Sequence, residues 1–393
     1  MARPLSVLTV SLPDAPSPPD VREARRHFPA TERVAYFNTA GVGLASRDLI
    51  AAYHAHADEW AGAALDYGRG EAAAELARET VAGLIGADAS DVALIASVSA
   101  AAGLVASQFG PARRGQNVVI GEREYSSNHF PWRQLEHRGY DVRLVPFRNG
   151  GLEPEDVARH VDGGTSLVAF SAVQTATGFR ADIAAISALA RAAGALVFVD
   201  GCQLVGALPV GDDLAGVDVL ATSDHKFLMH AGRGIGYCYI SPALQARCIP
   251  FNAGWKAGRV PFESFFGPEM ELSSTASRFD NSISWVAAVG NVAALGAFAE
   301  FGAGTIYARN AELEARLRES LADAGRPPID LAAGNRSSIV AVPLGGAEPR
   351  PLLGHLKRSG VACSVRDGNL RMSVHFYNHE DDIERLTRAL TSG

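Results

Sequence analysis

Residues 199–236 read VDGCQLVGALPVGDDLAGVDVLATSDHKFLMHAGRGIG, a stretch in which polar residues follow two apolar runs. The runs are ALVFV (195–199) and VDVLA (217–221), and their length is typical of buried strands. The polar residues are Asp200 and Gln203 after the first run, and Ser223, His225 and Lys226 after the second. We therefore expect two neighbouring strands whose polar ends meet at one edge of a sheet, where parallel sheets bind their ligands.

Five more apolar runs of similar length lie on either side of this stretch. They are VALIA (92–96), NVVI (117–120), VRLVP (142–146), LVAFS (167–171) and IGYCYI (235–240). Segments with the apolar spacing of helices separate most of the runs, as in residues 181–193, which are followed by Gly194. This alternation predicts an α/β fold, with a large domain whose mainly parallel seven-stranded sheet is flanked by helices on both faces.

The pattern changes after residue 285. The elements predicted there are helices over 285–301 and 306–324, strands over 338–343 and 370–374, and a last helix from Asn378, whose side chain would cap it together with Asp381. This order is typical of a smaller α+β domain. We divide the chain into an N-terminal arm (1–35), of which we expect residues 1–20 to be flexible, a large domain (36–285) and a small C-terminal domain (286–393).

The composition excludes several classes of protein. With 393 residues, of which 47% are hydrophobic and 20% charged, the chain has the make-up of a globular protein. Its net charge of -7 argues against nucleic acid as a partner, and because no run of 18 apolar residues occurs we expect no membrane span. The four cysteines form neither a disulfide framework nor a zinc motif, which favours the cytoplasm.

Two further motifs are weak. His54 and His56 have no third ligand nearby, so they predict a surface helix and no metal site. The sequence GRGIG (232–236) imitates a dinucleotide-binding loop, but it precedes its strand where such loops follow one, which argues against NAD.

The residues around Asp200 and Lys226 have a chemical meaning as a group. Taken singly, Asp200 would cap the turn that follows it and Lys226 would be a solvated surface residue. Together, a carboxylate, an amide and a lysine at one sheet edge can hold a charged heterocycle covalently, since a lysine among apolar and cationic neighbours becomes nucleophilic.

The two motifs Asp-x-x-Gln (Asp200, Gln203) and Ser-x-His-Lys (Ser223, His225, Lys226) resemble the class V aminotransferase family of pyridoxal phosphate enzymes. This family includes cysteine desulfurases, kynureninase, isopenicillin N epimerase-like proteins and carbon–sulfur lyases. The resemblance extends from Tyr36 to about Leu386. It implies fold type I, pyridoxal 5′-phosphate as cofactor, and a homodimer with its sites at the subunit boundary.

The resemblance also implies roles for the residues that bind the cofactor ring. Lys226 would bond covalently to the cofactor and carry protons to and from the substrate Cα. Asp200 would keep the pyridine nitrogen protonated, and Gln203 would hydrogen-bond the phenolic oxygen. Tyr125, in GEREYSSNHFPW (121–132), stands where the family commonly has a stacking histidine. The alternative for Tyr125 is a core aromatic.

The phosphate would lie where Ser97, Val98 and Ser99 follow the strand VALIA and begin a helix, since backbone amides at a helix N-terminus bind anions. The residues that the resemblance assigns to the phosphate are Val98, Ser99, Ser223 and His225, with Ser282 reaching the partner subunit's phosphate. Alternatively, Ser99 is only a helix cap.

Substrate recognition is implied at both ends of the chain. Arg371, in GNLRMSV, matches the arginine that binds the substrate α-carboxylate, for which a guanidinium fork is well shaped. Asn38 would be a second polar contact, and Thr177 lies in a loop that usually approaches cofactor and substrate. The alternative for Arg371 is a surface ion pair.

The residues just before Arg371 bear on the reaction type. Cysteine desulfurases carry a nucleophilic cysteine just before the arginine strand, whereas the interval RDGNL (366–370) is short and has none, and Cys363 falls in a predicted strand. Our leading hypothesis is a lyase that acts on an amino acid and cleaves a cysteine S-conjugate by β-elimination. Decarboxylation-coupled oxidative deamination, epimerisation and transamination stay open, and a non-enzymatic binding homologue is disfavoured by the intact Lys226, Asp200 and Arg371.

Overall fold

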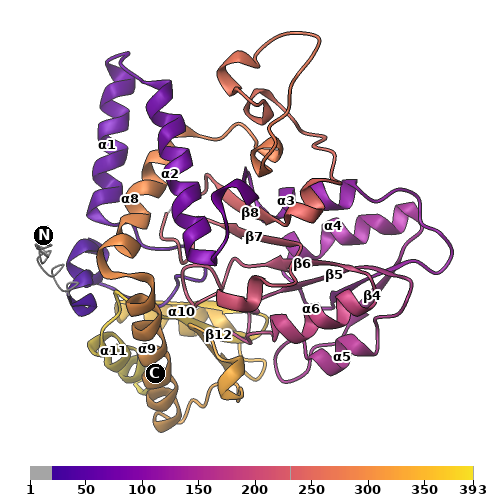
Figure 1. The fold of residues 1–393 in the computed structure, drawn as a ribbon. Coiled ribbons are helices and arrows are strands. Elements are labelled where there is room, and N and C mark those ends of the chain that lie inside the picture. Colours follow the sequence, from indigo (N-terminus) through magenta and orange to yellow (C-terminus); the bar gives the residue numbers. More distant parts are fainter. Residues whose placement is uncertain (1–19, 231, 393) are drawn as a thin grey trace, which may run out of the picture.

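The computed structural model describes residues 20–230 and 232–392, and a seven-stranded sheet forms the centre of its large unit (Figure 1). The strands are β2 (Val92–Ile95), β3 (Asn117–Gly121), β4 (Asp141–Val145), β5 (Thr165–Ser171), β6 (Leu196–Asp200), β7 (Val219–Ser223) and β8 (Gly236–Ile240). Their order is β2-β8-β7-β6-β5-β3-β4. All seven predicted strands are confirmed. Only β8 runs antiparallel to its neighbours, so β2 points the same way as β7.

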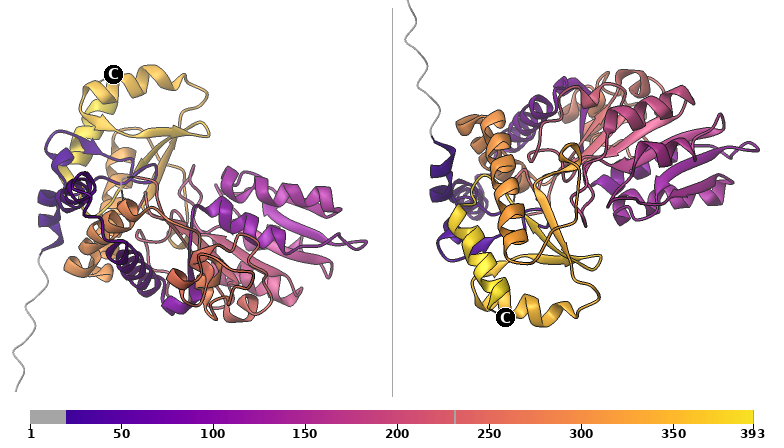
Figure 2. Two further views of the ribbon diagram at one scale, coloured as in Figure 1. Left: turned by 90° about the horizontal axis from the view of Figure 1, so that it is seen from above. Right: turned by 90° about the horizontal axis from the view of Figure 1, so that it is seen from below.

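Helices cover both faces of this sheet (Figures 1 and 2). The helices of the large unit are α1 (Arg47–Ala61), α2 (Tyr67–Ile85), α3 (Val98–Ser107), α4 (Phe130–Arg133), α5 (Pro154–Ala158), α6 (Ile183–Ala192), α7 (Pro242–Gln245) and α8 (Trp285–Phe301). Successive residues of β6 alternate between two cores: Val197 and Val199 belong to the one that includes α6, and Phe198 to the one that includes α3. A strand buried on both faces reads as a continuous apolar run, which is why the runs were recognisable.

The smaller unit is built from the C-terminal third of the chain. Its elements are α9 (Ala303–Asp323), β9 (Ile339–Pro343), α10 (Pro349–Arg358), β10 (Val361–Ala362), β11 (Ser364–Arg366), β12 (Asn369–Ser373) and α11 (Glu380–Thr391). Strands β11, β12 and β9 form an antiparallel sheet in that order, and α9, α10 and α11 supply leucines to its core. The predicted α+β character of this part of the chain agrees with these elements.

The last helix begins later than expected. Glu380 is its first residue and His379 its N-cap, and the side chain of Asp382 accepts the His379 N–H. Asn378 is not the cap, because its side chain is committed elsewhere: it accepts the His375 N–H and donates to the Tyr36 carbonyl. The predicted Asn378 and Asp381 cap is therefore wrong.

Residues 20–35 are the described part of the predicted N-terminal arm, and they have regular structure. They form two 3-10 helices, η1 (Val21–His27) and η2 (Pro29–Glu32), and lead into β1 (Ala35–Tyr36), which pairs with β10. Arg25 of η1 forms a two-pronged ion pair with the buried Asp382 of α11, with N–O distances of 2.6 and 3.0 Å. Residues 1–19 lie outside the described residues.

Helix α8 packs against α1 and α2, although it follows the domain boundary predicted at residue 285. Gly302 then turns the chain with a φ of 78° between α8 and α9. We therefore propose that the two units divide near residue 302. Within the described residues, no single helix is long and apolar enough to cross a membrane, and α8 and α9 reach that test only as a pair bent by 85°.

Candidate active site

The carboxyl ends of β2, β3, β5, β6 and β7 face one cavity of about 190 Å³, which reaches the small unit. The residues that line it are Ala40, Gly41, Ala96, Ser97, Val98, Tyr125, Ser127, Thr175, Asp200, Cys202, Ser223, Asp224, His225, Lys226, Arg233, Gly234, Ile235, Arg366 and Arg371. The polar residues that follow β6 and β7 are thus brought together, as the sequence predicted for this edge of the sheet.

Asp200 is the last residue of β6 and is 5% exposed. One of its carboxylate oxygens, Oδ1, accepts the Cys202 N–H at 2.9 Å, which fixes the carboxylate toward the cavity. The Cys202 thiol lies 3.1 Å from the Ser223 hydroxyl at the end of β7. Burial, together with the neighbouring Asp200 charge, raises the pKa of Cys202 to about 12, so this thiol stays protonated.

Gln203 is buried one turn beyond Asp200. Its Nε2 donates to the Ala40 carbonyl at 3.1 Å and to Thr175 Oγ1 at 3.0 Å. Its amide oxygen is buried and has no hydrogen-bond partner among the described residues. A buried acceptor without a donor is unfavourable, so this oxygen is suited to a ligand that carries a donor.

Lys226 and Tyr125 face each other across the cavity. Lys226 Nζ lies 5.5 Å from the centre of the Tyr125 ring, and within the described part of the chain Nζ forms no hydrogen bond. Tyr125 is 45% exposed and precedes the 3-10 helix η4 (Ser126–Asn128). It is therefore not a core aromatic, and its ring is available for stacking.

The N-terminus of α3 forms another wall. Ser97 is its N-cap, with Oγ accepting the Ala100 N–H at 3.2 Å and lying 2.9 Å from Ser99 Oγ. Ser97 and Val98 line the cavity, whereas Ser99 stands behind them. His225 also lines the cavity, with its Nδ1 3.6 Å from the buried Asp224 carboxylate.

Arg371 lies opposite, on β12, and is 1% exposed. Its guanidinium donates to Thr175 Oγ1 at 2.8 Å, to Ser364 Oγ at 3.2 Å and to Asn38 Oδ1 at 3.3 Å. All of these acceptors are neutral, and no carboxylate pairs with it in residues 20–230 or 232–392. Burial and the nearby Arg366 charge lower the pKa of Arg371 to about 10. Arg371 is therefore not part of a surface ion pair, and a buried cation of this kind is suited to bind an anion.

Five predicted residues do not line the cavity. Gln203, Ser99 and Asn38 are hydrogen-bonded to residues that do, whereas Thr177 and Ser282 are not. Thr177 turns away from it, because its hydroxyl donates to the Gly150 carbonyl at 2.6 Å; Thr175, two residues earlier, takes the position beside Arg371. Ser282 is exposed in the extended segment before α8. The backbone of its neighbour Asn281 is tied to Leu94 of β2.

Six polar lining residues were missed by the sequence reasoning: Ser127, Thr175, Cys202, Asp224, Arg233 and Arg366. Cys202 could have been found, because it lies between Asp200 and Gln203 in the motif itself. The side chains of Thr175 and Arg366 come from a loop and a hairpin of different units, and only the fold brings them together.

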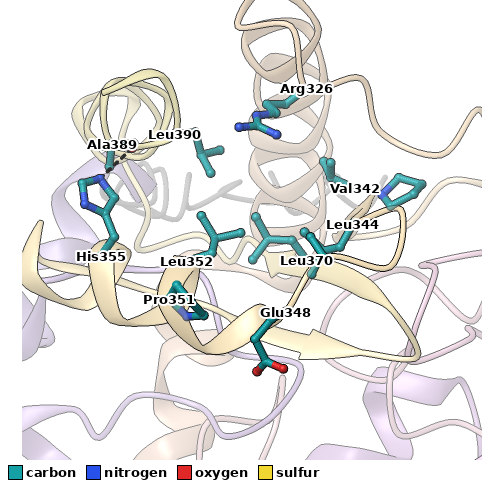
Figure 3. Close-up of a pocket in the computed structure, with 12 residues that line it drawn as sticks. Arg326, Val342, Leu344, Glu348, Pro351, Leu352, His355, Leu370, Ala389 and Leu390 are labelled. Atoms are coloured by element: carbon teal, nitrogen blue, oxygen red, sulfur yellow. Dashed lines mark hydrogen bonds between the residues drawn. The ribbon is translucent and has the colours of Figure 1, made fainter. Parts of the chain in front are cut away.

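A second cavity, of about 380 Å³, lies in the small unit (Figure 3). Its walls are mainly apolar, including Val342, Leu352 and Leu370, and His355 Nε2 is held by the Ala389 carbonyl at 2.9 Å. No strand-end polar residue of the large unit lies there. The candidate active site is therefore the smaller cavity at the sheet edge.

Comparison with known proteins identifies the family. Residues 36–386 match the family model for class V aminotransferases. The chain belongs to the class V aminotransferase family. Pyridoxal 5′-phosphate is the cofactor of this family, so both the predicted family and the predicted cofactor are confirmed.

Three curated relatives are 27–28% identical to the chain. An uncharacterized aminotransferase of Bacillus subtilis is 27% identical over 310 residues, 79% of this chain and 80% of the relative. The isopenicillin N epimerase of Streptomyces clavuligerus is 28% identical over 396 residues, 94% of this chain and 98% of the relative. A probable cysteine desulfurase of Methanothermobacter thermautotrophicus is 27% identical and covers 80% of this chain and 82% of the relative.

Solved structures confirm the predicted fold type. The cysteine desulfurase of Thermococcus onnurineus has a TM-score of 0.81 at 22% identity, over 94% of this chain and 97% of that one. A cystine C–S lyase in complex with cysteine persulfide has a TM-score of 0.82 at 20% identity, over 93% of this chain and 99% of that one. These similarities establish fold type I.

The residues of the cavity fit the family's cofactor. A pyridine nitrogen suits the Asp200 carboxylate, a phosphate suits the backbone N–H groups at the start of α3, and an aldehyde suits the free amine of Lys226. The unpartnered oxygen of Gln203 is the kind of buried polar atom that a bound molecule satisfies.

Proposed function

We propose that the chain is a lyase that cleaves the carbon–sulfur bond of a cysteine S-conjugate by β-elimination. Overall, the conjugate and one water would give a thiol, pyruvate and an ammonium ion. The Cα–H and Cβ–S bonds break, and the electron pair of the Cβ–S bond leaves with sulfur, so no oxidant or reductant is needed.

The observation that carries this proposal is the state of the cysteines. Cys202 lines the cavity, and Cys363, between β10 and β11, precedes Ser364, whose hydroxyl accepts a hydrogen bond from Arg371. Burial raises the pKa of each to about 12, so neither provides a thiolate that could take sulfur from the substrate. Sulfur that leaves the substrate would therefore leave in the product thiol.

The hairpin before Arg371 supports the same proposal. Asp367 and Gly368 form its turn, with φ values of 48° and 75°, and the two strands pair directly on either side. Backbone of this kind makes a two-residue hairpin connection. A desulfurase-type loop with a reactive cysteine has no room in so short a connection.

Each catalytic role in the proposal belongs to a residue at the sheet edge. Bound pyridoxal phosphate supplies an electron sink for negative charge at the substrate Cα. Lys226 would hold the cofactor until the substrate amine displaces it, and its freed Nζ would then take the Cα proton. Asp200 keeps a proton on the ring nitrogen, Gln203 binds the ring oxygen, and Tyr125 lies against the ring face.

The remaining predicted residues would bind the two anions. Backbone N–H groups of Val98 and Ser99, with Ser223 and His225, would hold the phosphate. Arg371 would hold the α-carboxylate and Asn38 would assist it, with Thr175 in the place that we had expected for Thr177.

The test is product analysis with the holoenzyme and S-alkyl-L-cysteines. β-Elimination predicts pyruvate, ammonia and thiol in equal amounts. Carbon dioxide with hydrogen peroxide would indicate oxidative decarboxylation, recovery of the D-isomer would indicate epimerisation, and transfer of the amino group to a keto acid would indicate transamination. Any of these three in place of pyruvate would overturn the proposal.

We also propose that the enzyme is a cytoplasmic homodimer. Four free cysteines are consistent with a reducing compartment. A loop (residues 249–271) projects from the large unit (Figure 1). It supports self-association, because its Phe251, Phe262, Phe265 and Phe266 are exposed to water. In the dimer, Ser282 would reach the phosphate of the partner subunit.

A further inference from the structure

The cavity holds a second arginine on the same face of the hairpin as Arg371. Strands β11 and β12 pair with Ser364 opposite Arg371 and with Arg366 opposite Asn369. Residues directly opposite, and residues two apart on one strand, share a face of an antiparallel pair. Arg366 therefore projects to the same side as Arg371, and both line the cavity.

The two arginines differ in depth. Arg371 is 1% exposed at the floor of the cavity, whereas Arg366 is exposed at its rim. As diagonal neighbours on an antiparallel pair, their Cβ atoms are about 7–8 Å apart. One small anion at the floor would thus leave the rim guanidinium available for a second anion.

Arg366 is not neutralised by the protein. Its guanidinium donates to the Val365 carbonyl at 2.8 Å, and among the described residues it pairs with no carboxylate. The nearest acidic residue along the chain, Asp367, is engaged by Arg123 at 2.6 Å. A third cation, Arg233, also lines the cavity and is exposed.

The acidic residues of the cavity do not offset these charges at the rim. Asp200 and Asp224 are the carboxylates that line it, and both are buried at the sheet edge. Asp224 is held there by the Ile235 N–H at 2.8 Å and by Asn291 at 3.1 Å. The rim is therefore positive, which attracts anions to it.

We propose that Arg366 binds a carboxylate at the far end of the substrate side chain while Arg371 binds the α-carboxylate. The substrate class is then a dicarboxylic amino acid, and under the proposed function, on which this rests, it is an S-(carboxyalkyl)cysteine. Arg233 adds to the positive field around the distal group.

The test compares S-carboxymethyl-L-cysteine with S-carbamoylmethyl-L-cysteine, an uncharged substrate of nearly the same shape. The wild type should favour the carboxymethyl substrate in kcat/KM by about tenfold or more, as a charge-assisted hydrogen bond allows. In Arg366→Gln this ratio should fall close to one, and Arg366→Lys should restore part of it. An unchanged ratio in Arg366→Gln would overturn the proposal.

A matched control variant and a binding measurement test the second carboxylate site independently of the proposed reaction. Arg350→Gln removes an exposed charge from α10, where the side chain is 94% exposed, and should leave the ratio as in the wild type. Calorimetry of the holoenzyme with glutarate and its half-amide needs no turnover. Tighter binding of glutarate, lost in Arg366→Gln, would support the second carboxylate site even if no pyruvate forms; equal binding of the two by the wild type would refute it.

Discussion

Lys226 Nζ lies 5.5 Å from the centre of the Tyr125 ring. The lysine that follows β7 and the tyrosine that follows β3 therefore face each other across the candidate site. This separation leaves room for a planar molecule to lie against the phenol while it bonds to the lysine. The chain contains three lysines, and the other two are differently placed: Lys256 is buried in an ion pair with Glu71, and Lys357 lies on α10.

Lys226→Ala should abolish the covalent bond between protein and cofactor. The expected result is loss of the visible absorbance band and of the cofactor that borohydride fixes to the chain, as measured by mass spectrometry of peptides. Lys357→Ala is the matched control and should keep both signals. A fixed cofactor at Lys256 or Lys357 in the wild type would contradict the assignment.

Asp200→Asn should retain the cofactor but slow turnover. An amide cannot hold the ring proton, and the loss of one preorganised electrostatic contact slows kcat by about 100- to 1000-fold. Steady-state kinetics and a spectral titration of cofactor would measure both effects. Asp212→Asn, which changes an exposed carboxylate on the surface, should have wild-type kinetics. Normal turnover in Asp200→Asn would refute the proposed role.

Tyr125→Phe distinguishes a stacking ring from an acid. If the phenol only stacks, the phenylalanine variant should keep most of the activity and the same product, whereas Tyr125→Ala should bind cofactor more weakly. A fall of about 100-fold or more in kcat for Tyr125→Phe, or a new product, would instead make the hydroxyl a proton donor.

Glu124 predicts a pH dependence of stability. Burial raises its pKa to about 7 from 4.5, although Ser171 and Gln174 donate hydrogen bonds to it. Between these values the folded chain holds a proton that the unfolded chain releases, so this group's contribution to the free energy of unfolding falls as pH rises from about 4.5 to 7. Above that range the loss is complete.

Glu124→Gln removes this titration while it keeps the shape of the side chain. Its Tm should therefore fall less than that of the wild type as pH rises from about 5 to 8. Scanning calorimetry at several pH values measures the difference. Glu155→Gln, at an exposed position of α5, should follow the wild-type curve, and parallel curves for all three proteins would exclude the buried titration.

Phe266→Ser should weaken the proposed dimer without unfolding the subunit, because the Phe266 side chain is 95% exposed. The base of its loop is fixed by the Lys256–Glu71 ion pair and by a hydrogen bond of 2.7 Å from Arg259 N to the Glu271 carbonyl. Light scattering over a concentration series should show more monomer. Leu144→Ser, on the edge strand β4 at the other side of the sheet, should not change the mass; a wild type that is already monomeric would contradict the dimer.

The sequence allowed the strands of the large sheet to be predicted because each is buried on both faces. It did not predict the direction of β8, since an apolar run such as GYCYI has no polarity along the chain. Helix termini depend on local competition for hydrogen bonds, and Asn378 was misassigned because its partner, the Tyr36 carbonyl, is 342 residues away in the sequence.

Motif residues were predictable where chemistry restricts the residue type. Asp200, Lys226 and Arg371 each need a charge or an amine that few residue types supply, and all three line the cavity. Thr175 could not be separated from Thr177 in this way, because both are threonines in one loop. Gly178, which follows Thr177, has a φ of 79° and packs against β9. An added Cβ there would lie 2.1 Å from the Ile339 carbonyl oxygen, so close packing between the two units sets the turn of this loop.

The burial of Arg371 among neutral acceptors couples recognition to folding. Its hydrogen-bond partners come from three distant parts of the chain, Asn38, Thr175 and Ser364. A carboxylate that joins them binds the folded chain and has no such cluster to bind in the unfolded one, so binding shifts the folding equilibrium. Even a carboxylic acid that is never turned over should therefore raise the melting temperature, because under the proposed role of Arg371 the bound anion would hold residues of the two units together.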